Sequence, residues 1–325
     1  METTAPRRYA WLFYCLLAIG MWGLWGIVAK AAETEVKPVP MQVISTAGVL
    51  VVWVLLLSPN VRKVAPGGER RRHLLLGGAF AFGTGLCGGI GNLAMLKSFN
   101  EGAEASAVLP LTGMFPLVTV LLAIVILRER LNVIQAIGMV VALVAIYLFN
   151  RSAGGAPTAS SGWEAWVSRW VAYALVALVL WGIAGVLQKL ATNHISSELS
   201  TVLFAAAFVP VAVFLMLTDQ MTWTLSGKGW ALVLLYGALI GFGTLVLFAA
   251  YRDGKASVVT ALYALYPALT VLLAIPIFDE RMSYQKAAAI GLALAAGVAL
   301  SYEGQPARAA EPVGVGAESN EVVAR

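Results

Sequence analysis

The chain has 325 residues, of which 60% are apolar and only 12% are charged, and its mean hydropathy is +0.82. Ordinary soluble domains carry about 25% charged residues, so this composition argues against a water-soluble fold. The net charge of +5 comes without a basic cluster large enough to indicate nucleic-acid binding, and attraction to a membrane surface accounts for it.

Ten runs of at least 16 residues contain no Asp, Glu, Lys, Arg or His. A transmembrane helix needs about 20 largely apolar residues, and a barrel strand needs about half that length. The sequence therefore predicts an all-α integral membrane protein with ten transmembrane helices. In chain order the runs are 9–29, 38–61, 74–96, 105–127, 131–150, 170–188, 199–218, 229–251, 256–278 and 287–302.

The first run has a signal peptide as its alternative interpretation, because Arg7 and Arg8 precede it and Ala29-Lys30-Ala31 resembles a cleavage site. Its apolar part is longer than that of a signal peptide, and the same sequence pattern recurs in the middle of the chain. A transmembrane helix is therefore favoured for this run.

The second half of the chain repeats the first. Trp22-Gly23 precedes Lys30 at the same spacing as Trp181-Gly182 precedes Lys189. Residues 105–130, aligned without gaps on residues 256–281, are identical at 14 of 26 positions. The chain is thus predicted to be a duplication, with five helices in residues 1–150 and five in residues 166–303.

Two consecutive copies of an odd number of helices must enter the membrane in opposite senses, which is the inverted-topology repeat of secondary transporters. Residues 151–165 are predicted to be a flexible linker, because they are rich in Gly, Ser and Ala. Residues 304–325 are polar and unpatterned and are predicted to form a disordered tail.

The distribution of basic residues predicts that both termini are cytoplasmic, because this places 14 of the 22 Lys and Arg residues inside. The run Arg70-Arg71-Arg72 decides most of this count, and we interpret it as a topology determinant that touches anionic lipid. The expected location is the inner membrane of a bacterium.

These features resemble the drug/metabolite transporter (DMT) superfamily, and within it the EamA-type exporters with two five-helix repeats. The resemblance covers residues 10 to 303 and implies a central cavity formed by helices 1, 3 and 4 of one half and 6, 8 and 9 of the other. It also implies alternating access without ATP hydrolysis, and the chain contains no GxxxxGK[ST] loop. The motifs that carry it are Trp-Gly in the first helix of each half, the Ala-Ser pairs at 105 and 256, Pro116 and Pro267, and the Glu-Arg pairs at 129 and 280.

One departure from the superfamily is informative. The small multidrug resistance relatives carry a proton-exchanging Glu in the first helix, eight residues before a Lys, and here Trp22 and Trp181 occupy that position. No acidic residue lies within the ten runs, so the usual intramembrane carboxylate relay is not expected. This favours a uniporter or an exchanger over a proton antiporter.

Two lysines are candidate substrate ligands. Lys30 and Lys189 close equivalent helices, and each is either a cation that faces the cavity vestibule or an interfacial lysine that extends to the lipid headgroups. In the first case they bind an anionic or zwitterionic substrate.

The two mid-run prolines, Pro116 and Pro267, are predicted to kink their helices and to free backbone carbonyls near the cavity. The residues before them differ between the halves. Tyr263 and Tyr266 offer hydroxyl groups where Thr112 and Phe115 stand in the first half, so these side chains either shape the cavity or pack against neighbouring helices.

Three further residues complete the candidate cavity. Trp22 and Trp181 are either aromatic walls of the site or packed core residues, and Asn92 either contacts substrate or forms an interhelical hydrogen bond.

The pairs Glu129-Arg130 and Glu280-Arg281 follow equivalent helices and are either helix-end ion pairs or a gate latch.

The sequence offers no catalytic or metal-binding constellation. Cys15 and Cys87 lie in apolar runs, and His73 and His194 are 121 residues apart, so neither disulfides nor HExxH zinc chemistry are expected. No cofactor is predicted, and the expected partners are a small-molecule substrate and the lipid bilayer, with a homodimer left open.

The leading functional prediction is therefore a carrier that exports a small polar or zwitterionic metabolite, such as an amino acid. Two alternatives remain within transport, namely an exporter of lipophilic or cationic drugs and a flippase for a lipid-linked sugar. A receptor or scaffold that moves no substrate is a more distant alternative.

Overall fold

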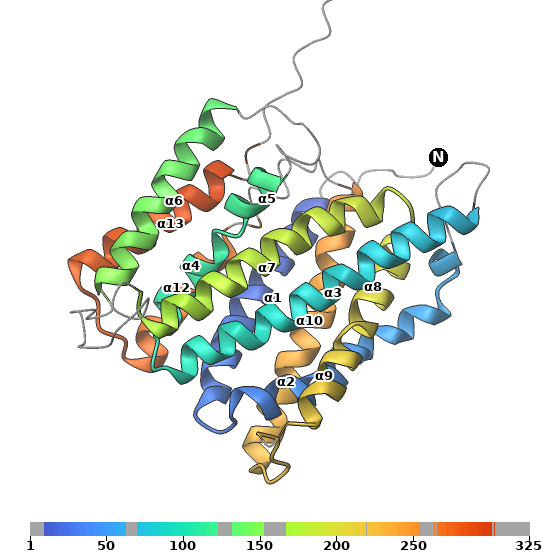
Figure 1. Cartoon of the computed structure of the whole chain (residues 1–325), viewed down its shortest axis with the longest axis horizontal. Coiled ribbons are helices and arrows are strands. Elements are labelled where there is room, and N and C mark those ends of the chain that lie inside the picture. Colours follow the sequence, from blue (N-terminus) through green and yellow to red (C-terminus); the bar gives the residue numbers. More distant parts are fainter. Residues whose placement is uncertain are drawn as a thin grey trace, which may run out of the picture.

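The structure is a computed structural model, and it describes residues 10–62, 70–122, 132–152, 167–218, 220–253, 263, 265–300 and 302. These residues fold into α-helices and short 3₁₀-helices that pack as a bundle (Figure 1). In chain order the elements are α1 (Ala10–Glu33), α2 (Pro38–Val49), η2 (Leu50–Leu57), η3 (Pro59–Arg62), α3 (Arg70–Asn100), α4 (Ala105–Gly113), α5 (Pro116–Leu122), α6 (Val133–Ser152), α7 (Arg169–Thr192), α8 (Ser197–Ala206), α9 (Phe208–Met216), α10 (Gly227–Asp253), α12 (Tyr266–Phe278) and α13 (Tyr284–Leu300).

Six helical segments of the described chain are long and apolar enough to cross a membrane. They are Trp11–Glu33, Pro38–Leu57, Arg70–Asn100, Arg169–Thr192, Ser197–Met216 and Gly227–Leu247. Shorter apolar helices occupy the other four predicted runs, at Ala105–Thr119, Val133–Phe149, Tyr266–Phe278 and Tyr284–Leu300. The helical class is thus confirmed, and the number of ten spanning helices stays a prediction.

The two prolines that were predicted to kink their helices lie at the starts of helices. In the first half α4 ends at Gly113 and Pro116 is the first residue of α5. Proline has no N–H for the carbonyl of Thr112, which instead accepts a hydrogen bond of 3.1 Å from the Phe115 amide. Pro267 lies in the first turn of α12, which begins at Tyr266, so both prolines start a helix where we expected them to bend one.

The second predicted helix also differs from the expectation of one continuous α-helix. It is α-helical only from Pro38 to Val49 and continues as the 3₁₀-helix η2. The linker and tail predictions concern residues that lie almost entirely outside the described ranges, although α6 extends to Ser152.

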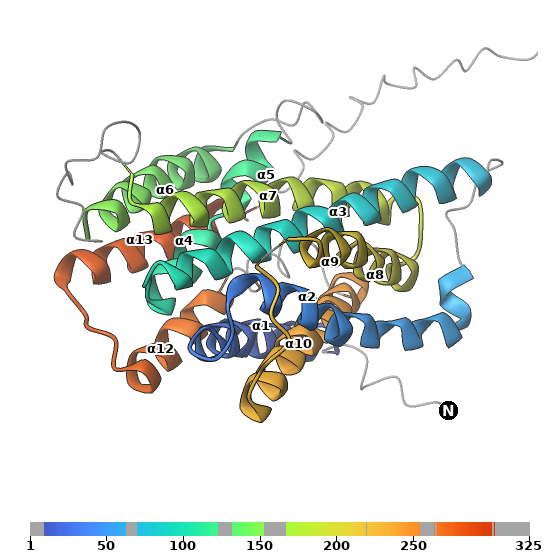
Figure 2. The same cartoon turned by 60° about the horizontal axis from the view of Figure 1, so that its bottom comes forward.

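Helices of the two halves pack against each other in matching pairs. The most extensive contacts join α3 to α7 and α1 to α10, and the first helix of each half is thus paired with the third helical run of the other half. Figure 2 shows α3 and α7 side by side above the pair formed by α1 and α10, with α6 and α13 together at one edge. The center of the bundle therefore lies between the two halves.

Two glycines allow the closest helix contacts. A Cβ atom added to Gly237 of α10 would lie 2.0 Å from the carbonyl oxygen of Ser45 in α2, and one added to Gly85 of α3 would lie 2.2 Å from that of Phe204 in α8. Ser45 follows Trp22 by the same number of residues as Phe204 follows Trp181, so the two residues are equivalent in the repeat. The two halves thus use the same backbone-to-backbone contact.

Two threonines join the halves by equivalent hydrogen bonds. Thr119 Oγ1 donates to the Gly182 carbonyl at 2.9 Å, and Thr270 Oγ1 donates to the Gly23 carbonyl at 3.0 Å. Thr119 and Thr270 occupy the same position of the repeated 26-residue segment. Each half therefore binds the first helix of the other half in the same way.

We expect Thr119→Val and Thr270→Val each to lower the free energy of unfolding by about 0.6 kcal/mol, the average for interhelical hydrogen bonds in membranes. The measurement is thermal unfolding of the detergent-purified protein. Thr84→Val is the matched control, because the Thr84 hydroxyl donates only to Phe80 of its own helix. A loss in the control as large as in the two variants would contradict the assignment to the interhelical bonds.

Candidate substrate site

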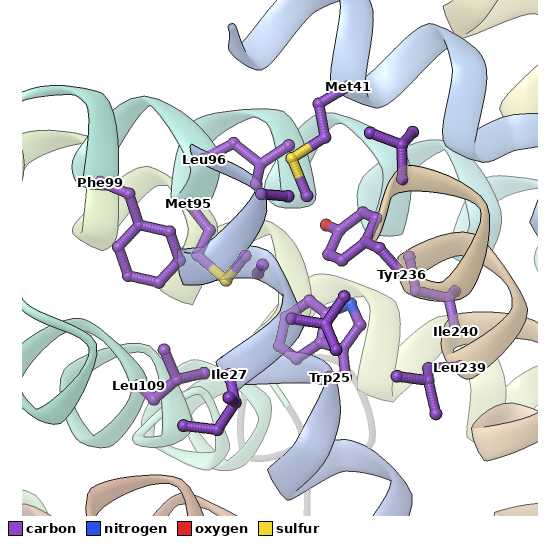
Figure 3. Packing of buried hydrophobic residues seen from close by; sticks show 14 of the residues in the cluster. Trp25, Ile27, Met41, Met95, Leu96, Phe99, Leu109, Tyr236, Leu239 and Ile240 are labelled. Carbon is purple, nitrogen blue, oxygen red and sulfur yellow. The ribbon is translucent and has the colours of Figure 1, made fainter. Parts of the chain in front are cut away.

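Aromatic side chains from both halves meet in the center of the bundle. The ring centroid of Trp25 in α1 lies 5.4 Å from Trp22, 5.8 Å from Trp181 of α7 and 5.7 Å from Tyr236 of α10. Trp25 and Tyr236 are completely buried. Figure 3 shows these two rings together in the core, with Met41 and Met95 beside them. The predicted residues Trp22 and Trp181 thus flank a shared aromatic center.

The two predicted tyrosines extend this cluster. Tyr263 and Tyr266 stack on each other at 5.3 Å between ring centroids, and they lie 6.3 and 6.4 Å from Trp22. Four of the predicted site residues are therefore gathered in one place. Trp25 and Tyr236 were missed by sequence reasoning, although Trp25 follows Trp22 by three residues and must lie near it on a helix.

The indole N–H groups of Trp22 and Trp181 are buried and make no hydrogen bond to a described residue. Each indole edge packs against a glycine of the other half. A Cβ atom added to Gly243 would lie 3.0 Å from Trp22 Nε1, and one added to Gly91 would lie 2.5 Å from Trp181 Nε1. A buried donor without an acceptor costs about 1–3 kcal/mol, so these two positions are points where an added acceptor would be favourable.

Two side-chain amides are also buried in the bundle. Asn92 of α3 is 5% exposed, and the Gln42 amide of α2 is completely buried with neither of its polar atoms hydrogen-bonded to a described residue. Asn92 lies one turn before Met95 and Leu96, which pack in the same core as Trp25. Sequence analysis missed Gln42, because a single Gln in an apolar run does not show whether its side chain points into the bundle.

The end of α4 lies in contact with the start of α12. A Cβ atom added to Gly113, the last residue of α4, would lie 2.7 Å from Cγ of Pro267. The Thr112 hydroxyl is completely buried and donates to the carbonyls of Val108 and Leu109 in its own helix, at 2.9 and 3.2 Å. The end of α4 and the start of α12 therefore meet between the halves. The Thr112 hydroxyl donates its proton within its own helix.

Lys30 is not a free cation. Its Nζ donates to Glu33 at 2.8 Å and to the Ala103 carbonyl at 2.9 Å, and it lies 5.4 Å from the center of the Phe99 ring. It therefore joins the end of α1 to the segment before α4, and its role toward a substrate stays a prediction. Lys189 belongs to α7, but its side chain lies outside what the structure describes.

The structure also brings together polar residues that are distant in the sequence. The two histidines, His73 of α3 and His194 after α7, lie with their Nδ1 atoms 2.9 Å apart. Glu280 and Lys286 are the charged side chains that are buried in the described part of the chain. The described residues contain no group of three or more His, Cys, Asp and Glu side chains that could hold a metal ion.

The fold and its core define a helical membrane protein built from two similar halves. The EamA-like transporter family matches residues 9–151 and again residues 168–302. The chain therefore belongs to the EamA-like transporter family, and the predicted membership of the DMT superfamily is confirmed. As a member it is a multi-pass membrane protein of a transporter family, a class that is generally not enzymatic.

Solved structures with the same fold exist. One crystal structure, titled "Crystal structure of protein", matches with a TM-score of 0.59 and 17% sequence identity, over 90% of this chain and 96% of the other. At this identity the match shows the fold alone. No curated protein matches the chain.

Proposed function

We propose that this protein is a secondary transporter that exports a small polar or zwitterionic metabolite, such as an amino acid, by alternating access without ATP hydrolysis. In this proposal its ten helices form two inverted repeats in a bacterial inner membrane, with both termini cytoplasmic. The substrate is held where the aromatic cluster joins the two halves.

The observation that carries this proposal is the set of buried hydrogen-bonding groups without described partners beside the aromatic rings. The indole N–H groups of Trp22 and Trp181 supply two such donors. The buried Asn92 amide, which carries both a donor and an acceptor, lies one turn before Met95 of the same core. Lys30 is neutralised by Glu33. A substrate with several polar atoms and no net charge fits these groups, because it can satisfy them without burying an unpaired charge.

Alternating access is supported by the equivalent contacts of the two halves. Gly85 and Gly237 make the same backbone contact, and Thr119 and Thr270 make the same hydrogen bond. When two halves meet through matching surfaces, two packings of similar free energy related by exchange of the halves are available.

Export of a lipophilic cation is the second candidate function. The faces of Trp and Tyr rings attract cations, and the cluster gathers Trp22, Trp25 and Trp181. The neutralised Lys30 removes the repulsion that a free lysine would exert on such a substrate.

Ligand-induced thermal stabilisation distinguishes these candidates. The purified protein is screened against amino acids, other organic anions and zwitterions, nucleosides, polyamines and lipophilic cations, and each hit is then tested for flux in liposomes. A ligand at a hundred times its Kd stabilises the folded state by about 2.7 kcal/mol. A hit confined to lipophilic cations would replace the metabolite proposal by the second candidate, and binding without flux would indicate a receptor.

The two indole donors provide the site-specific variants. We expect Trp22→Phe or Trp181→Phe to weaken binding of a polar ligand about tenfold, because each removes one N–H donor and keeps an aromatic ring. Trp223→Phe is the matched control, since Trp223 is 56% exposed and lies outside the cluster. Equal affinities in all three variants would show that the ligand does not bind at the aromatic cluster.

A further inference from the structure

A carboxylate of the second half holds the start of a helix in the first half. Glu280 follows α12, and its side chain is 3% exposed. Its Oε1 accepts a hydrogen bond of 2.7 Å from the Ala105 amide, and its Oε2 accepts one of 3.1 Å from the Ser106 amide. The Ser106 hydroxyl also donates to Oε2. Three donors at the start of α4 thus converge on one buried carboxylate.

This arrangement replaces a local helix cap. The first backbone N–H groups of a helix have no partner within it, and the residue before the helix normally supplies one. Here Glu104 precedes α4 but its side chain makes no capping hydrogen bond. The negative charge of Glu280 also interacts favourably with the N-terminal end of the helix dipole. The position of α4 is therefore determined by a residue 175 positions away in the chain.

The turn after α12 is built to present this carboxylate. Asp279 has a φ of 51°, a left-handed conformation that few residues other than Gly adopt, and it ends α12. The Glu280 amide then donates to the Ile275 carbonyl at 3.2 Å. The backbone of Glu280 is thus fixed against its own helix while its side chain reaches α4.

Lys286 balances the charges around Glu280. It is 5% exposed, and its Nζ donates to Glu104 and, at 3.2 Å, to the Arg281 carbonyl, and lies 3.6 Å from Glu280 Oε2. One cation therefore serves two carboxylates, one from each half.

We propose that Glu280 is the latch of a gate, which holds α4 against the second half and closes this end of the bundle. The inference rests on the proposed transport function. Because the turn at Met114 and Phe115 separates α4 from α5, α4 can move as a unit when its start is released. Leu109, one turn inside the latch, is completely buried in the central core and becomes accessible when α4 moves.

An exposed ion pair between the halves supplies a matched control. Glu35 accepts hydrogen bonds from Lys228 and from the Ser226 hydroxyl, each at 2.9 Å, and so joins the turn after α1 to the start of α10. The hydrogen bond from Lys228 lowers the pKa of the Glu35 carboxyl below its ordinary value. Glu35→Gln removes the same charge as Glu280→Gln, but from a solvent-exposed contact that does not hold α4.

The test measures the accessibility of a cysteine placed behind the latch. Cys15 and Cys87 are replaced by Ala, Leu109→Cys is introduced, and a membrane-impermeant thiol reagent is applied to intact cells and to inverted vesicles, which covers either orientation of the chain. We expect Glu280→Gln to raise the labelling rate from one side about tenfold, because a hydrogen-bonded charge biases an equilibrium by that much. Glu35→Gln is expected to leave the rate unchanged.

Unchanged labelling in Glu280→Gln, or an equal increase in Glu35→Gln, would overturn the latch. If Glu280→Gln does not fold, the latch is tested with Ser106→Ala. This variant removes one donor to the Glu280 carboxylate and should raise the labelling rate, by less than the tenfold expected for Glu280→Gln. Labelling requires no substrate. If the labelling rate changes in Glu280→Gln but the protein shows no flux in liposomes, the gate is therefore retained and the transport proposal is rejected. If the protein shows flux but the labelling rate does not change, the latch alone is rejected.

Discussion

Gly237→Ala and Gly85→Ala should each destabilise the folded protein by about 1–3 kcal/mol, the range for overpacking in a dense interior. In both cases the added methyl group would meet a backbone carbonyl oxygen, at 2.0 Å in α2 and 2.2 Å in α8. A backbone atom cannot move aside as a flexible side chain can, so the two helices must separate. Thermal unfolding in detergent measures the effect.

Glycines in open surroundings are the controls for this prediction. A Cβ atom added to Gly20 or Gly291 would meet no atom within 4 Å. Both lie in helices, where alanine is preferred over glycine by about 1 kcal/mol, so Gly20→Ala and Gly291→Ala should be neutral or stabilising. A similar loss of stability in all four variants would show that close backbone approach is not the cause.

Lys286→Met should lower the free energy of unfolding by about 3–5 kcal/mol, the range for removal of one partner from a buried ion pair. The variant leaves Glu280 buried and Glu104 beside it with no cation between them. Lys286→Arg keeps the charge and should recover most of the loss. Chemical or thermal unfolding in detergent measures both variants.

Lys228→Met provides the comparison for Lys286. It removes a lysine that also binds a glutamate of the other half, but the Lys228 side chain is 68% exposed. Exposed ion pairs contribute little to stability, so no measurable change is expected. Equal losses in Lys286→Met and Lys228→Met would indicate a general electrostatic effect of the lysines and not the burial of Glu280.

The sequence predicts helices well because the length of an apolar run is a local property. The repeat marks Trp22 and Trp181 as equivalent residues, and both rings lie beside Trp25 in the structure, while their role as walls of a substrate site stays a prediction. It does not predict that helices begin at Pro116 and Pro267, because whether proline bends or starts a helix depends on the packing of neighbouring helices.

The contacts between distant polar residues were beyond sequence reasoning. His73 and His194 come from different halves, and Glu280 reaches a helix 175 positions away, so no local pattern links them. The repeated Ala-Ser and Glu-Arg pairs marked both ends of the Glu280 contact without showing that they meet. Lys30 was placed correctly near a helix end, but its partners Glu33 and Ala103 depend on how α1 meets the segment before α4.

The shortness of α4 has a mechanical consequence. Its nine residues form a rod roughly 13 Å long at 1.5 Å per residue, with Ala105 at one tip and Gly113 at the other. The first tip rests on Glu280 and the second on Pro267, and both of these supports belong to the second half. A helix this short is stiff. A displacement of its first residue at Glu280 is therefore transmitted without loss to its last residue at Pro267.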